Sequence, residues 1–294
     1  GCAMIRQTPK IAPLDGRLYA LRDVTATVPS IPLISASIVS KKVAEGISAL
    51  VLDVKYGSGA FMRDPEDAIR LAETLVELAR SEGVRATALL TAMEQPLGLA
   101  VGNALEAAEA VECLGGAGPA DLRKVTIALA VESVRAARPD VVASEVRTQL
   151  EAMLDDGRAL GRFARLVERQ GGDPSVARDP GILPAAPLQV PWNAPSDGVV
   201  TRADAYEIGL ASVELGAGRR TIEDEVDPAV GIVLQAKRGD TVRAGEPVAL
   251  IHARTEEAAG AALARLERAY EIGQEAPAEM PLVWRRFPAE GSAD

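Results

Sequence analysis

The sequence has no excess of basic residues, and this narrows the range of partners that it can bind. Lysine and arginine total 32, against 42 aspartates and glutamates, so the formal net charge is −10. A nucleic-acid surface needs clustered basic residues to neutralise phosphates, so this balance argues against DNA or RNA as a partner. An anionic substrate would need a local positive pocket.

Cysteine and histidine are also scarce. Cys2 and Cys113 are far apart and form neither a CxxC nor a Cys/His pattern, which argues against a disulfide framework and a zinc site. This usage fits a reducing cytoplasm. The one histidine, His252, lies in the apolar run 248–253, where a structural role is favoured over a catalytic one.

Long apolar runs are missing as well. No stretch approaches the length that spans a bilayer, and no basic segment followed by an apolar one opens the sequence. We therefore expect neither a membrane partner nor export. The sequence starts at Gly1 without an initiator methionine, in what reads as the end of a buried strand, so we expect a fragment of a longer protein.

The remaining composition is that of a folded protein. The chain has 294 residues, 48% of them hydrophobic and 25% charged, which suffices for one large or two moderate domains. Periodicity predicts strands at 49–54 and 85–90, and helices near 30–45, 64–82, 104–114, 121–137, 143–156 and 158–170. Shorter β-like runs follow at 189–192, 198–202, 230–237 and 248–253, with helices near 204–215 and 256–272.

This order predicts an α/β fold with a central, mostly parallel sheet flanked by helices, followed by a smaller α+β C-terminal domain. Glycine and proline are frequent from about 172 to 187, which predicts a linker there. We therefore expect an α/β base-binding domain at 1–176 and a C-terminal domain at 177–294.

The segment 18–42 carries several reactive polar groups in an apolar run. Arg22 precedes a predicted helix in which Ser37 and Lys41 stand four residues apart, on one face. A guanidinium, a hydroxyl and an ammonium could converge there on a small ligand. A helix capped by Ser30 with lysines near its C-terminal end would need no ligand, and the pattern alone favours that structural interpretation.

Two glycines follow the first predicted strand, in the run Tyr56-Gly-Ser-Gly-Ala60. They could form a plain strand-to-helix turn or let a backbone approach a phosphate or sugar. The spacings of the dinucleotide-binding and P-loop motifs are absent, so the pattern leaves both interpretations open.

The run LYALRDVTATVPSIPLISASIVSKK, followed by ALVLDVKYGSGAFM at 49–62, resembles the signature region of thymidine and pyrimidine-nucleoside phosphorylases. The resemblance extends over nearly the whole chain, through PLGLAVGNALE at 96–106, LDDGRALGRF at 154–163 and LGAGR at 215–219. It implies a homodimeric cytoplasmic pentosyltransferase of nucleoside salvage. In this family phosphate is the co-substrate, no cofactor is required, and a nucleoside yields a free base and a (deoxy)ribose 1-phosphate.

The resemblance also assigns residues. It implies that Arg22, Ser37 and Lys41 contact the pyrimidine, with Arg22 and Lys41 stabilising charge on the departing base. Ile34 and Phe61 would wall the ring, and Tyr19 is a further candidate; a plain core role is an equal alternative for these three. Some members hold a monovalent cation, here through the carbonyls of Leu97 and Ala100 and the carboxylate of Glu109, although Glu109 could instead be a solvated helix residue.

The chain departs from the family pattern in two places. It has no counterpart of the N-terminal helical domain, with its Lys-His-Ser and Gly-rich phosphate loop, and Ala92 stands where many bacterial members have Asp. We therefore expect the base-binding half of an active site. Two alternatives are a catalytically inactive pyrimidine-binding or scaffold fragment, and an anthranilate-type phosphoribosyltransferase, which the run LYALRDVT and the C-terminal domain disfavour.

Overall fold

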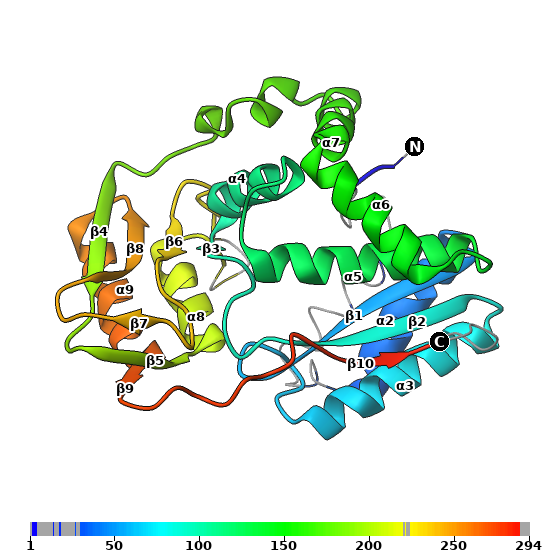
Figure 1. Cartoon of the computed structure of the whole chain (residues 1–294), viewed down its shortest axis with the longest axis horizontal. Coiled ribbons are helices and arrows are strands. Elements are labelled where there is room, and N and C mark those ends of the chain that lie inside the picture. The colour runs from blue at the N-terminus through cyan, green and yellow to red at the C-terminus, as the bar shows by residue number, and fades with distance from the viewer. Residues whose placement is uncertain are drawn as a thin grey trace.

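The computed structural model describes residues 2–4, 14, 18, 27, 30–219, 221 and 224–288. Figure 1 shows two packed parts, a larger one with most of the helices and a smaller one rich in strands. The larger part contains α2 (Ile31–Ala44), β1 (Ala49–Tyr56), α3 (Pro65–Ser81), β2 (Arg85–Ala92), β3 (Ala100–Val101), α4 (Asn103–Leu114), α5 (Ala120–Ala137), α6 (Ala143–Asp155) and α7 (Arg158–Arg169). Two short 3-10 turns, η1 (Pro174–Ala177) and η2 (Pro180–Ile182), lie within the predicted linker.

The C-terminal domain follows that linker. Its elements are β4 (Leu188–Asn193), β5 (Gly198–Ala203), α8 (Ala205–Leu215), β6 (Gly231–Leu234), β7 (Thr241–Val242), β8 (Pro247–Ala253), α9 (Glu256–Ala269) and β9 (Tyr270–Gly273). A last strand, β10 (Val283–Phe287), runs back to the larger part, which we call the α/β domain.

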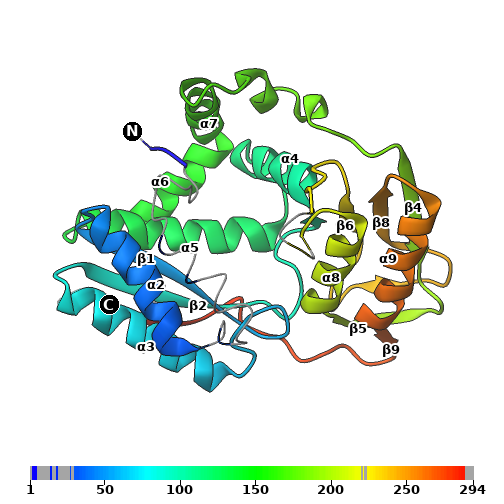
Figure 2. The same cartoon turned by 180° about the vertical axis from the view of Figure 1, so that it is seen from behind.

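The sheet of the α/β domain has the order β1-β2-β10. β1 and β2 pair in parallel from Ala49 opposite Arg85 to Tyr56 opposite Ala92, as expected for consecutive buried strands joined by a helix. β10 pairs with β2 in the antiparallel direction. Helices α2 and α3 cover one face of this sheet and α5 the other (Figure 2). The predicted fold class is therefore confirmed.

Helix α3 shows how the sequence sets these elements. Asp64 accepts a hydrogen bond from the Glu66 backbone N–H at 2.7 Å, which caps the helix, and Pro65 occupies its first turn. Its apolar stripe, which includes Leu71 and Leu75, packs on the sheet. This packing fixes the wall of the cavity described below.

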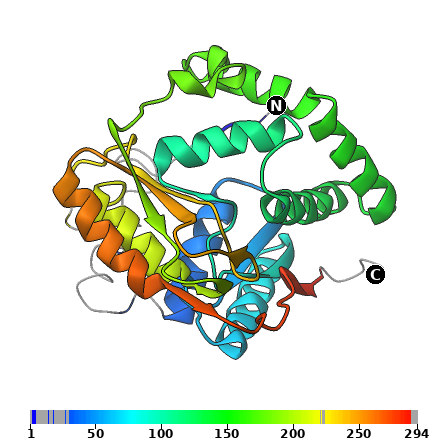
Figure 3. The ribbon, with the colours of Figure 1, turned by 60° about the vertical axis from the view of Figure 1, so that its left-hand side comes forward.

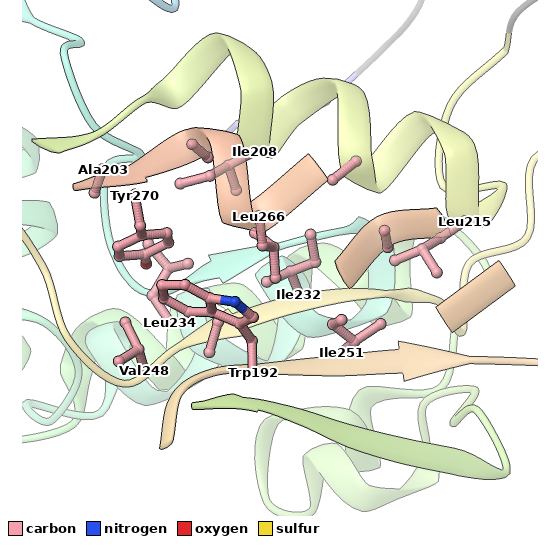
Figure 4. Close-up of a cluster of buried hydrophobic side chains, with 14 of the residues drawn as sticks. Trp192, Ala203, Ile208, Leu215, Ile232, Leu234, Val248, Ile251, Leu266 and Tyr270 are labelled. Atoms are coloured by element: carbon pink, nitrogen blue, oxygen red, sulfur yellow. The ribbon is translucent and has the colours of Figure 1, made fainter. Parts of the chain in front are cut away.

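The C-terminal domain stacks helices on two small sheets, ordered β3-β6-β8-β4 and β7-β5-β9. Helices α8 and α9 lie side by side over these strands (Figure 3). The close-up in Figure 4 shows Trp192, Ile232, Ile251 and Leu266 converging between them. The predicted helix at 256–272 was too long at its end, because Tyr270 to Gly273 form β9 against β5.

The two domains exchange strands. β3 comes from the α/β domain but pairs with β6, and β10 comes from the end of the chain but pairs with β2. The boundary expected between residues 176 and 177 therefore does not separate the sheets, and it stays a prediction. Within the described ranges, no helix combines the length and apolar character needed to cross a membrane.

Candidate active site

Helix α2 brings Ser37 and Lys41 together, as the spacing predicts. The Lys41 ammonium donates a hydrogen bond to the Ser37 hydroxyl at 3.4 Å across one helical turn. Ser30 stands at the N-cap, as expected, but its side chain makes no capping hydrogen bond. Lys41 and Lys42 lie in the last turn, where positive charge interacts favourably with the helix dipole.

A cavity of about 350 Å³ lies beside this pair. Its lining residues are Ile34, Ser37, Ile38, Lys41, Leu52, Asp53, Val54, Lys55, Phe61, Met62, Leu71 and Leu75. The cavity therefore gathers four of the predicted site residues from α2 and from the loop before α3. The other two pyrimidine candidates, Tyr19 and Arg22, lie outside the described residues.

The apolar candidates differ in burial. Phe61 is 68% exposed although it lines the cavity, so burial in the core does not explain this aromatic residue. Ile34 is half-buried and also packs against the core of the α/β domain. Exposure of a large aromatic ring beside a cavity favours a ligand-covering role for Phe61 over a core role.

A network of three polar side chains beside this cavity was not predicted. Thr91 is fully buried on β2, directly opposite Lys55 on β1. Its hydroxyl donates to Asp53 Oδ1 at 2.5 Å, while the Lys55 ammonium donates to Thr91 Oγ1 at 2.9 Å and to Asp53 Oδ2 at 2.5 Å. The available signal was the pair of charged residues in an otherwise apolar strand. Their partner becomes apparent only from the strand register.

The glycines after β1 serve close packing. A Cβ at Gly59 would lie 2.7 Å from the Cβ of Ala205, and one at Gly57 would lie 2.9 Å from the backbone nitrogen of Glu94. Gly57 also has φ +111°, a conformation that favours glycine. Glycine is therefore needed at both positions because the turn packs closely against the loop after β2 and against the C-terminal domain. Of the two sequence interpretations, the geometry favours the structural turn.

The predicted cation ligands lie around one loop. Glu109 on α4 is 9% exposed, and its Oε1 accepts hydrogen bonds from the backbone N–H groups of Leu99 at 2.7 Å and Ala100 at 3.0 Å. Burial raises the pKa of Glu109, an effect that these backbone donors oppose. Glu109 is therefore not a solvated helix residue.

This donor set fits a monovalent cation. Leu97 and Ala100 would offer carbonyl oxygens beside the Glu109 carboxylate, and such hard oxygen ligands suit an alkali ion. Among the described residues, no group of three or more histidine, cysteine or acidic side chains is arranged to hold a metal ion. The cation role of Leu97, Ala100 and Glu109 stays a prediction.

His252 has a structural environment. It lies on β8, between Gln189 on β4 and Gly231 on β6, and its Nε2 is buried without a hydrogen-bond partner among the described residues. Burial lowers its pKa, so the ring stays neutral at neutral pH. This partly buried placement within the sheet of the C-terminal domain agrees with the expected structural role.

Comparison with known families covers both domains. The model of the glycosyl transferase family a/b domain matches residues 1–160. The model of the pyrimidine nucleoside phosphorylase C-terminal domain matches residues 199–273.

Individual relatives agree with these family matches. The pyrimidine-nucleoside phosphorylase of Bacillus subtilis (strain 168) is 47% identical over 254 residues, which are 86% of this chain and 59% of that protein. The protein of the same name from Staphylococcus haemolyticus (strain JCSC1435) is 48% identical over 254 residues, with the same coverage. The chain thus spans about three fifths of the length of these relatives. It belongs to the pyrimidine-nucleoside phosphorylase family, with the a/b domain of the glycosyl transferases joined to the C-terminal domain that marks these enzymes.

Proposed function

We propose that this chain provides the pyrimidine-binding side of a nucleoside phosphorylase, a pentosyltransferase of nucleoside salvage. The observation that carries the proposal is the cavity beside α2, which is lined by the hydrogen-bonded pair Ser37 and Lys41 and by the exposed Phe61. The family relationship supports the reaction. Inorganic phosphate attacks the anomeric carbon, the glycosidic bond breaks, and its electron pair leaves with the pyrimidine.

The residues of the cavity suit this departure. As negative charge grows on the ring, the Lys41 ammonium can donate a hydrogen bond to a ring carbonyl oxygen and neutralise the charge. The Ser37 hydroxyl can both donate and accept, which suits the alternating carbonyl and N–H groups of a pyrimidine-dione edge. Ile34 and Phe61 would cover the ring faces, while Arg22 would supply a second cation.

The other components are also part of the proposal. Leu97, Ala100 and Glu109 would hold a monovalent cation, whose charge would offset the buried carboxylate. No other cofactor is required. A homodimer in the cytoplasm is the assembly and location that we propose from the family resemblance.

Titration calorimetry with thymine tests the site. We expect Lys41→Ala to weaken thymine binding about 10- to 100-fold, since a hydrogen bond to a charged group contributes roughly 1.5–3 kcal/mol. Lys42→Ala is the matched control, because the neighbouring Lys42 pairs with Glu45 at 3.0 Å in the same helical turn. Equal affinities of the two variants would reject this site.

A second measurement separates the enzyme from a non-catalytic binder. The chain is incubated with thymidine, with and without phosphate, beside the Bacillus subtilis relative as positive control. Phosphate-dependent release of thymine supports phosphorolysis by this polypeptide. Thymine binding without release would instead support the pyrimidine-binding fragment, and failure of both would reject the base-binding proposal.

A further inference from the structure

The ammonium group of Lys237 lies where the two domains meet. Lys237 belongs to the turn between β6 and β7, yet its Nζ donates to the carbonyl oxygens of Pro96 at 2.7 Å and Gly98 at 2.8 Å. It also forms an ion pair with the Asp121 carboxylate, in the first turn of α5. One cation of the C-terminal domain therefore contacts two separate elements of the α/β domain.

Hydrogen bonds fix the conformation of the turn that carries Lys237. The Lys237 backbone N–H donates to Asp240 Oδ2 at 2.8 Å, and Gly239, with φ +100°, closes the turn. The backbone N–H of Gly239 then donates to the Val200 carbonyl of β5 at 2.8 Å. The Lys237 side chain is only 13% exposed, so most of its water shell has been replaced by protein oxygens.

The loop 96–100 makes hydrogen bonds to two side chains of opposite charge. The Lys237 ammonium donates to carbonyl oxygens of the loop, and the Glu109 carboxylate accepts from the backbone N–H groups of Leu99 and Ala100. Gly98 permits this approach, because a Cβ there would lie 2.1 Å from Glu109 Oε2. The loop 96–100, which contains the carbonyls expected to bind a cation, is thus fixed between an ammonium and a carboxylate.

We propose that Lys237 is a built-in monovalent cation that couples the C-terminal domain to this loop. Two backbone carbonyls and one carboxylate form an oxygen set of the kind that binds ammonium or potassium ions. The Lys237 ammonium occupies the place of such an ion, and because it belongs to the C-terminal domain, it links that domain to the loop. Without the side chain, the same oxygens form a site for a free ammonium or potassium ion. This inference does not depend on nucleoside chemistry.

The two tryptophans allow domain coupling to be measured. Trp192 is buried in the core of the C-terminal domain, whereas Trp284 on β10 packs against Tyr56 of the α/β domain, with ring centroids 5.3 Å apart. Trp284→Phe therefore leaves a reporter for the C-terminal domain, and Trp192→Phe leaves one for the α/β domain. With Lys237 present, we expect both reporters to melt at the same temperature.

Removing the cation should separate these transitions. In Lys237→Ala we expect at least one midpoint to fall by roughly 5–10 °C, because Asp121 and two carbonyls lose a largely buried partner. Arg238→Ala is the matched control, since it removes the adjacent positive charge but retains the backbone N–H that donates to Gln95 Oε1 at 2.9 Å. An unchanged, coincident transition in Lys237→Ala would overturn the proposed coupling.

Salt rescue tests whether the oxygen set binds a cation. Ammonium chloride should raise the lowered midpoint of Lys237→Ala more than tetramethylammonium chloride at equal ionic strength, since only the smaller ion fits the vacated space. Lys237→Met fills that space with an uncharged chain, so it should lose coupling without gaining an ammonium response. An equal ammonium response in the two variants would overturn the cation site.

A charge-retaining variant covers the case in which Lys237→Ala does not fold in any salt. Lys237→Arg keeps a cation on the same turn and should keep the two transitions closer together than Lys237→Met does. If arginine and methionine give the same separation, the charge has no part in the coupling and the proposal fails.

Discussion

The core of the C-terminal domain and helix α2 of the α/β domain bury their side chains to different depths. In the C-terminal core, Ile232, Ile251 and Leu266 are all fully buried between strands and helices. In α2, only Ser35 and Val39 are buried, and Leu33 is 42% exposed. One region is a packed scaffold, and the other presents polar and apolar groups to a cavity.

The two regions differ in what stabilises them. The C-terminal domain is stabilised by closely packed side chains, so shortening any of these side chains weakens its contacts. Packing stabilises helix α2 less, because fewer of its side chains are buried. In our proposal, a bound ligand adds further contacts to Ser37 and Lys41. One chain can therefore combine a closely packed scaffold with a less packed helix whose remaining contacts are made by a bound ligand.

Truncation of matched isoleucines tests this difference most strongly. We expect Ile251→Ala to lower the free energy of unfolding by about 3 kcal/mol, because it leaves a cavity in a fully packed core. Ile38→Ala, at a half-buried position of α2, should cost only about 1 kcal/mol, in proportion to the smaller apolar area it buries. Urea unfolding measures both. Equal losses would show that α2 is packed as firmly as the C-terminal core.

Helix capping gives a smaller test of the same contrast. Asp204 caps α8 in the C-terminal domain by accepting from the N–H groups of Tyr206 and Glu207, each at 3.0 Å. Asp64 caps α3 in the α/β domain with one such bond. We expect Asp204→Ala to cost about 1–2 kcal/mol and Asp64→Ala about 0.5–1 kcal/mol. Thermal unfolding of both variants provides the measurement, and the reverse order would contradict the ranking.

The sequence predicted those features that depend on residues close together in the chain, such as helices and contacts within one helix. Helices were located because an apolar stripe repeats every three to four residues, and Ser37 meets Lys41 for the same reason. The short strands β3, β7, β9 and β10 were missed. A strand such as β10 exists only because β2 lies beside it, so no local pattern marks it.

The same limit applies to the polar contacts. The link from Asp53 and Lys55 to Thr91 requires the register of β1 on β2, and Lys237 reaches a loop about 140 residues earlier in the chain. Neither contact has a signature within one segment. Long-range polar contacts were therefore the part of the site that sequence reasoning could not supply, whereas the family resemblance supplied the expected chemistry.

The pH dependence of stability should show the smallest of these effects. Burial lowers the pKa of His252, so between its folded pKa and the unfolded value near 6.5 the unfolded chain binds more protons. The free energy of unfolding should therefore fall as the pH drops below about 6.5. His252→Gln removes this titration, so urea unfolding of the variant between pH 5 and 7 should show a weaker dependence than the parent chain. An unaltered slope in His252→Gln would mean that other groups titrate in this range and that burial of the histidine does not control acid stability.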